Sequence, residues 1–213
     1  MTEIPLVLRL KKDSHKKIAE AQDILVKEIY KFFNNAVLHG GTSIWRCYNG
    51  NRFSEDVDFY LKRDLSKIGQ FFDSLEKKGF VVEKKKISEN SIFSTLIFER
   101  TNVRFEAVFK DKIGILKEYE LSDGNFINIY TLSSEQLINE KVDAYLKRKK
   151  IRDVYDIFFL IRYVSDFKLI KVKLRYLIDN FVMPIDKGDL KILILEGIVP
   201  SIEDMINYIK RYL

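Results

Sequence analysis

VLHGGTSIWRCYNGNRFSEDVDFY, residues 37–60, is the segment around which we interpret the whole chain. It ends in a short acidic strand pattern, Asp-Val-Asp-Phe. Because side chains alternate between the two faces of a β-strand, Asp56 and Asp58 are expected on the same face. Neighbouring carboxylates repel each other unless a cation lies between them, and Mg²⁺ prefers oxygen ligands of this kind. The pair therefore predicts a metal site, and such a metal indicates a phosphate substrate.

Two glycines in the same segment indicate the same chemistry. Gly40 and Gly41 follow a short apolar run and precede Thr42 and Ser43. Glycine permits unusual backbone dihedrals and lets a phosphate approach main-chain N–H groups, above all where a helix begins. Hydroxyl side chains at a helix start either cap the helix or contact a phosphate oxygen. We therefore expect these four residues to bind a nucleotide.

The two motifs, LHGGTS at residues 38–43 and RFSEDVDF at residues 52–59, resemble the signature of the AbiEii/MenT-type nucleotidyltransferases. That family lies within the DNA polymerase β-like superfamily, and many of its members are toxins of toxin–antitoxin or abortive-infection systems. The resemblance implies transfer of a nucleotide from an NTP, with two Mg²⁺ ions at Asp56 and Asp58. It also implies a cognate antitoxin protein as a partner.

The same resemblance implies an α+β fold. We expect a polymerase β-like nucleotidyltransferase core, with a mixed, mostly antiparallel sheet and helices, over residues 1–132. A C-terminal helical lobe over residues 133–213 is expected to complete the nucleotide site, in a cleft between the two lobes. Two further residues of the second motif, Arg52 and Ser54, are expected to bind the nucleotide.

Hydrophobic periodicity predicts the elements that carry these motifs. Helices are predicted at residues 13–35, 65–79 and 133–148, and strands at residues 80–87, 92–99 and 103–109. Short turns join those three strands, so they form a meander. Residues 111–131 are expected to be a mixed segment that ends in a strand-like run, and residues 168–213 two or three helices.

Glu106 is the candidate third carboxylate of the site. Along the predicted strand at residues 103–109 it alternates with apolar residues, so it faces away from the core. The resemblance implies two acids on one strand and a third on a neighbouring strand, where it orients or deprotonates the attacking hydroxyl. The alternative is that Glu106 is an exposed cross-strand partner of Arg104.

A second block, KVDAYLKR at residues 141–148 followed by RDVYDI at residues 152–157, also resembles the family. Lys141 and Arg148 are seven residues apart and therefore share one helix face. By the resemblance, Lys141 would hold the triphosphate with Arg148, and Asp153 or Asp156 would fix these cations or the nucleotide. The alternative is a local ion-pair set on the helix surface, which would contribute little to stability.

Composition limits the class of protein. A chain of 213 residues with 46% hydrophobic and 32% charged residues describes a folded domain with a real core. Its net charge of +6 is compatible with a nucleic-acid partner. Cys47 is the only cysteine, which excludes an intramolecular disulfide and indicates a reducing cytoplasm. No signal-peptide pattern or apolar run of the ~20 residues that a membrane span needs is recognisable.

The residues by themselves do not identify the molecule that accepts the nucleotide. The resemblance favours an RNA 3′ end, especially that of tRNA, whereas the same donor chemistry would also serve nucleotidylation of a protein side chain. A catalytically silent nucleotide or nucleic-acid binder would require Asp56 or Asp58 to be misplaced. A metal nuclease using Asp58 with Glu83 and Lys85 leaves the glycine pair unexplained. The basic run at residues 83–86 is typical of a solvated face, with RNA contact as the alternative.

Overall fold

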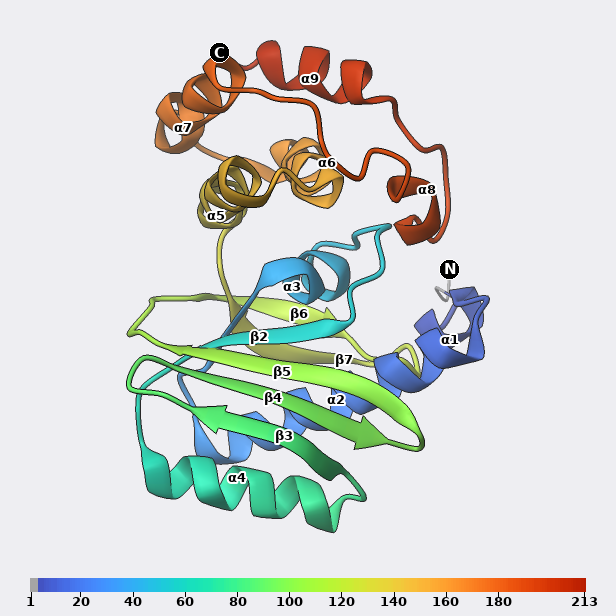
Figure 1. Ribbon diagram of the computed structural model, residues 1–213, viewed down its shortest axis with the longest axis vertical. Coiled ribbons are helices and arrows are strands. Elements are labelled where there is room, and N and C mark those ends of the chain that lie inside the picture. Colours follow the sequence, from blue (N-terminus) through green and yellow to red (C-terminus); the bar gives the residue numbers. More distant parts are fainter. Residues whose placement is uncertain (1–3) are drawn as a thin grey trace. The chain divides into compact units, whose positions relative to one another are not determined.

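The computed structural model describes residues 4–213, which form two compact units (Figure 1). Unit 1 comprises the chain up to Cys47 together with Ser54–Thr131. Unit 2 comprises Tyr48–Phe53 together with Leu132–Leu213. Residues 48–53, which we expected within the catalytic core, thus group with the C-terminal helices.

Unit 1 is built on one seven-stranded sheet with the strand order β3-β4-β5-β2-β1-β7-β6. The strands are β1 Val37–His39, β2 Asp56–Leu61, β3 Val81–Ile87, β4 Ser91–Phe98, β5 Thr101–Phe109, β6 Ile115–Glu120 and β7 Phe126–Thr131. The pairs β1–β7 and β2–β5 are parallel, and the remaining neighbours are antiparallel. The predicted mixed, mostly antiparallel sheet is confirmed.

Helices pack on one face of this sheet (Figure 1). The helices of unit 1 are α1 Leu6–Arg9, α2 Asp13–Phe32, α3 Gly40–Cys47 and α4 Leu65–Lys77. Aromatic rings fill the layer between α4 and the sheet: the ring centroids of Phe71 and Phe105 are 5.0 Å apart. On the α2 side, the rings of Tyr30 and Phe59 meet edge to face at 6.0 Å. Burial of this apolar surface, at roughly 25 cal/mol per Å², stabilises the layer.

Both ends of α4 follow from local sequence. The side chain of Asp64 accepts a hydrogen bond from the Lys67 backbone N–H at 3.1 Å, which caps the N-terminus. Gly79 has a φ of +93°, in the left-handed region that commonly ends a helix. The predicted helix at residues 65–79 is therefore confirmed, with its last turn ending at Lys77.

We call the other face of the sheet the open face. Its residues on β2, β3, β4 and β5 are exposed or half-buried, in contrast to the fully buried Val57 and Phe59 that alternate with them along β2. The open face includes Asp56, Asp58 and Tyr60 of β2, Arg104, Glu106 and Val108 of β5, Ser91, Phe93 and Thr95 of β4, and Lys84 and Lys86 of β3. The motif carboxylates therefore lie on the polar side of the sheet.

Unit 2 is helical. Its helices are α5 Ser134–Arg148, α6 Ile151–Leu160, α7 Lys168–Asp179, α8 Leu190–Leu193 and α9 Ile202–Lys210, with a 3₁₀ turn η1 at Ile161–Tyr163. A capping box of Ser133 and Gln136 starts α5 and confirms the predicted helix at residues 133–148. Within residues 4–213, none of the helices combines the length and apolar character that a membrane span requires.

One region differs from the predicted elements. The mixed segment at residues 111–131 contains two strands, β6 as well as β7, which pair with each other. In β6 only Tyr119 and Glu120 are buried, so the segment lacks the strict alternation by which a strand is recognised. This segment is therefore a strand because it pairs with β7, and its own residue pattern does not predict it.

Candidate active site on the open face

Gly40 lies where β1 passes into α3, and its backbone approaches Asp58 closely. The φ of Gly40 is +73°, a conformation that favours glycine. A Cβ atom at this position would overlap the carboxylate oxygen Oδ2 of Asp58. The pairing of β1 with β2 places His39 opposite Asp58, which explains the approach. The glycine turn and the acidic strand therefore meet, as our hypothesis requires.

Asp56 is held from two sides. The hydroxyl of Thr42 donates a hydrogen bond to the Asp56 backbone carbonyl. The Asp56 carboxylate accepts a hydrogen bond of 2.6 Å from Nε of Arg104, the residue opposite it in the register between β2 and β5. We had considered Arg104 as a partner of Glu106, but its carboxylate partner is Asp56. Arg104 therefore neutralises one acid of the site.

Glu106 lies directly beside Asp58 in the parallel register of β2 and β5. Partial burial raises the pKa of the Glu106 carboxyl, and the negative charges of Asp58 and Asp56 raise it further. Asp56 lies two residues from Asp58 on β2, so the three acids share one small area of the sheet. We name Asp56, Asp58 and Glu106 the carboxylate cluster.

The hydroxyl groups of the glycine motif are buried and bonded within unit 1. Ser43 Oγ lies 2.5 Å from Oγ1 of Thr131, which in turn donates to the Leu38 carbonyl at 2.8 Å. Gly41 is likewise buried in the first turn of α3. Ser54 is buried too, and its carbonyl accepts a hydrogen bond from Gln22. The hydroxyls of Thr42 and Ser43 hold the turn in place, so phosphate binding here would fall to backbone N–H groups.

The second predicted set lies in unit 2 and forms one charged network. Arg52 donates two hydrogen bonds to Asp156, at 2.8 and 2.9 Å. Lys141 Nζ lies 2.6 Å from the same carboxylate and 3.8 Å from that of Asp153. Arg148 also donates two hydrogen bonds to Asp153, at 2.7 and 2.6 Å. We name these five residues the buried charge cluster.

Burial rules out one of the two interpretations of this cluster. Asp153 and Asp156 are 0% and 1% exposed, so the alternative of an ion-pair set on the helix surface is wrong. Burial alone would raise the pKa of Asp156, but the charges of Arg52 and Lys141 lower it below its ordinary value. The side chain of Arg148 is 40% exposed and is the most accessible cation of the cluster. Each of the two acids therefore holds cations in place.

The carboxylate cluster fits a divalent cation by the chemistry of its donors. Three acids share one small area of the sheet face, and carboxylates so close together repel each other in a way that a cation relieves. The pKa of Glu106 is raised by burial first and by the charges of Asp58 and Asp56 in addition. In the side-chain arrangement of residues 4–213, no group of three or more His, Cys, Asp or Glu residues is placed to hold a metal ion. Asp56 is instead paired with Arg104.

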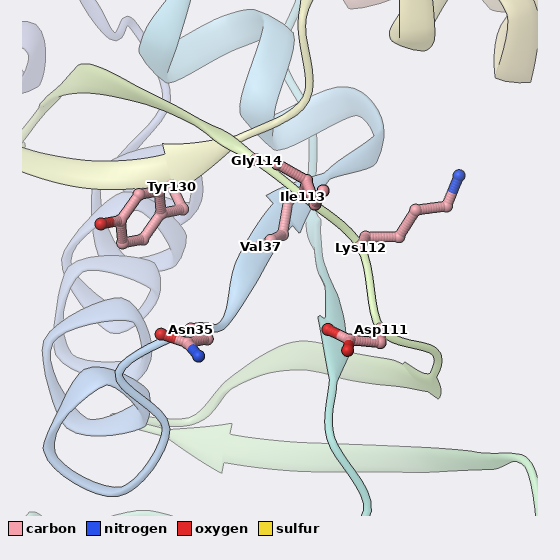
Figure 2. Close-up of a pocket in the computed structure, with 7 residues that line it drawn as sticks. All are labelled: Asn35, Val37, Asp111, Lys112, Ile113, Gly114 and Tyr130. Carbon is pink, nitrogen blue, oxygen red and sulfur yellow. The ribbon is translucent and has the colours of Figure 1, made fainter.

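A cavity of about 260 Å³ lies elsewhere in unit 1 (Figure 2). Its lining includes Asn35, Val37, Asp111, Lys112, Gly114 and Tyr130. None of the predicted site residues lines this cavity. Lys112 connects it to the open face, because its Nζ lies 5.6 Å from the centroid of the Tyr60 ring. Tyr60 in turn is stacked on His39 at 4.0 Å, two residues along β2 from Asp58.

Two features of the site were not predicted. Arg104 bonds to Asp56 because the strands β2 and β5 are parallel neighbours, which the separate strand patterns do not reveal. Arg46, one turn after the glycines, is 1% exposed and forms an ion pair with Asp23 of α2. An arginine within an apolar helical run is the sequence signal by which such a buried pair could have been suspected.

Comparisons with known proteins identify the family and the fold of the chain. Residues 23–187 match the family described as "Nucleotidyl transferase AbiEii toxin, Type IV TA system". No curated protein matches the chain. Among solved structures, JHP933 from Helicobacter pylori is similar with a TM-score of 0.61 and 19% identity, over 91% of this chain and 89% of that chain.

MenT4, a nucleotidyltransferase toxin from Mycobacterium tuberculosis H37Rv, is similar with a TM-score of 0.53 and 15% identity. That likeness covers 92% of this chain and 83% of MenT4. At these identities the two structures establish a shared fold, whereas the family match extends over most of the chain. The protein therefore belongs to the AbiEii family of nucleotidyl transferase toxins.

Proposed function

We propose that this protein transfers a nucleoside monophosphate from an NTP to the 3′ end of an RNA, with tRNA as the expected acceptor and Mg²⁺ as the cofactor. One observation carries the proposal: Asp58 lies against the backbone of Gly40 on one side and beside Glu106 on the other. The backbone proposed to bind phosphate (Gly40), the acid proposed to bind the metal (Asp58) and the acid proposed to accept the proton (Glu106) are thus neighbours in one unit.

Asp56 and Asp58 would hold the magnesium ions. When bound, Mg²⁺ supplies positive charge that stabilises the negative charge developing on the α-phosphoryl group and the departing pyrophosphate. The backbone N–H groups at the start of α3 contribute in the same sense, because the N-terminus of a helix attracts anions. Gly40 permits this approach because it carries no side chain toward Asp58.

Glu106 would accept the proton of the attacking RNA hydroxyl. The hydroxyl oxygen then forms the new bond to the α-phosphorus of the NTP, and the bond to pyrophosphate breaks. A raised pKa makes Glu106 a stronger base than an ordinary carboxylate, which favours this transfer.

In unit 2, Lys141 and Arg148 are proposed to bind the triphosphate. Asp156 holds Lys141, and Asp153 holds Arg148, so the two acids act as positioning residues. Arg52 is 5% exposed and donates both of its Asp156 hydrogen bonds inside the unit, which supports a positioning role for it as well. Lys141 and Arg52 thus both bind the carboxylate of Asp156.

Incubation of purified protein with each labelled NTP, Mg²⁺ and total tRNA tests the proposal. Label on RNA supports it, label on the protein itself supports side-chain nucleotidylation, and shortened RNA indicates a nuclease. We expect Asp58→Asn to lower transfer about 100- to 1,000-fold, the order of loss typical for groups that stabilise transition-state charge. Asp73→Asn, an exposed acid on α4, is the matched control. Undiminished transfer by Asp58→Asn would refute the assignment.

The toxin activity is proposed to depend on the same chemistry. Expression of the wild-type protein in bacterial cells is expected to arrest growth, and expression of the Asp58→Asn variant is not. A cognate antitoxin protein is expected to restore growth when it is expressed together with the wild type. Growth arrest by an Asp58→Asn variant that lacks transferase activity would separate toxicity from nucleotide transfer.

A further inference from the structure

The open face continues from the carboxylate cluster to the edge of the sheet in one straight row of side chains. Asp58 is opposite Glu106, Glu106 is opposite Phe93 on β4, and Phe93 is opposite Lys86 on β3. Residues in register on neighbouring strands lie on the same face at about 4.8 Å spacing. Lys86 is therefore only about 10 Å from Glu106, with an aromatic ring between them.

Charge divides this part of the open face, which includes the neighbouring row of Asp56, Arg104, Thr95 and Lys84, into two halves. The end at β2 and β5 carries the carboxylate cluster, whereas the end at β3 carries Lys84 and Lys86, both exposed. Lys84 lies over the Phe93 ring, with Nζ at 5.4 Å from the ring centroid. Lys85 alternates to the opposite face, where its Nζ lies 4.7 Å from the Phe72 ring of α4. The basic run at residues 83–86 is thus split between the two faces.

We infer that the β3–β4–β5 part of the open face binds the single-stranded 3′ end of the nucleic-acid acceptor. Phe93 stacks on a base, and Lys84 and Lys86 contact backbone phosphates, which directs the terminal hydroxyl toward Glu106. The orientation of the nucleic acid, with its 3′ end at Glu106, rests on the proposed function. The binding of the nucleic acid to this surface does not depend on it.

Charge complementarity and the aromatic ring together identify this class of ligand. Proteins bind single strands by pairing basic side chains that contact phosphates with aromatic side chains that stack on bases. The carboxylate cluster repels phosphates, so the phosphates of a bound strand are favoured on the β3 side. An RNA strand that places its phosphates at the lysines of β3 and its terminal hydroxyl at Glu106 makes favourable contacts with both halves of the surface. An acidic peptide would use the lysines but would not need Phe93.

Binding of a fluorescently labelled single-stranded RNA, measured by anisotropy without NTP, tests the two lysines. The double variant Lys84→Gln/Lys86→Gln is expected to lower the slope of log affinity against log salt by about 1.4, because each phosphate contact on a single strand contributes roughly 0.7. Lys85→Gln, the same change on the same strand but the opposite face, is expected to leave the slope unchanged. Equal losses in both variants would overturn the inference.

The ring is tested in the same assay. Phe93→Leu is expected to weaken RNA binding about tenfold, the scale of one lost base stack, whereas Phe93→Tyr retains it. Circular dichroism confirms that both variants are folded. If Phe93→Leu binds RNA as tightly as the wild type, Phe93 is not a stacking residue and the inference fails. Tighter binding of an acidic peptide than of RNA would also overturn it.

Transfer kinetics then separate this inference from the proposed function. In both Lys84→Gln/Lys86→Gln and Phe93→Leu, the KM for RNA should rise about tenfold while the KM for NTP stays unchanged. A protein that binds RNA through this face but transfers no nucleotide contradicts only the proposed function. A protein that transfers nucleotide with an unchanged KM for RNA in both variants contradicts only the binding surface.

Discussion

The carboxylate cluster of unit 1 and the buried charge cluster of unit 2 contain similar residues in opposite settings. On the open face, three acids lie close together and all are only partly buried, and Asp56 among them pairs with Arg104. In unit 2, two almost fully buried acids are surrounded by three cations. The first cluster has an excess of negative charge at a surface, and the second has an excess of positive charge inside its unit.

This difference separates the roles of the two clusters. Like charges at a surface destabilise the fold slightly and attract a cation, which suits a site that binds metal and substrate. Oppositely charged groups in a buried network depend on each other, because removing one leaves another buried and unpaired. Acids of the carboxylate cluster should therefore be dispensable for folding, whereas acids of the buried charge cluster should not.

The largest effect on stability is expected for Asp156→Asn. The change leaves Arg52 and Lys141 without their shared carboxylate, and such losses cost about 3–5 kcal/mol of unfolding free energy. Urea unfolding at pH 7 measures this cost. Asp143→Asn is the control, because its ion pair with Lys173 is exposed and should contribute less than about 1 kcal/mol. Equal effects of the two changes would remove the contrast between buried and exposed charge.

Glu135 tests whether an acid of unit 2 that is held by hydrogen bonds also stabilises the fold, as Asp156 is expected to do through its ion pairs. Burial opposes its charge, but hydrogen bonds from the backbone N–H and the hydroxyl of Ser165 help to lower its pKa to about 2. A lowered pKa stabilises the fold above about pH 4.5, and this contribution is lost as pH falls toward 2.

Glu135→Gln is therefore expected to cost about 2 kcal/mol at pH 7, the scale of hydrogen bonds to a charged group, and much less near pH 2. Urea unfolding of the wild type and the variant across this pH range gives the difference. A cost that does not depend on pH would show that packing, and not charge, accounts for the effect of Glu135.

Gly40→Ala should cost about 1–2 kcal/mol, because residue 40 is in the left-handed region and a Cβ would overlap Asp58. Thermal unfolding measures the cost, and transfer activity should fall as well, since the Asp58 carboxylate must move. Gly69→Ala in α4 is the matched control. Its added Cβ meets no atom within 4 Å, so it should stabilise the helix by up to about 1 kcal/mol. A neutral Gly40→Ala would contradict the close approach.

The smallest effect, and the opposite sign, is expected for Glu106→Gln. It removes a negative charge directly opposite Asp58, so the free energy of unfolding should stay the same or rise by a few tenths to about 1 kcal/mol. Transfer activity should be lost even though stability is not. A clear loss of stability would show that Glu106 is a structural residue, and the carboxylate cluster would then resemble the buried charge cluster.

The pattern of apolar and polar residues was sufficient for the elements with strong local signals. Alternation around Val57 and Phe59 identified β2, and hydrophobic periodicity identified α4 and α5. Strand β6 could not be predicted, because its two buried residues, Tyr119 and Glu120, are consecutive and do not alternate with exposed ones. Only its pairing with β7 defines it.

The chain by itself determined which residues carry charge, which of them share a face of one strand or helix, and where glycine is required. These properties depend on covalent order and on local periodicity, which are present in any single element. Only the tertiary structure decided that Glu106 is beside Asp58, that Arg104 bonds to Asp56, and that Asp156 is buried between Arg52 and Lys141. Each of these contacts joins residues far apart in the chain, and the register between strands or the packing of helices brings them together.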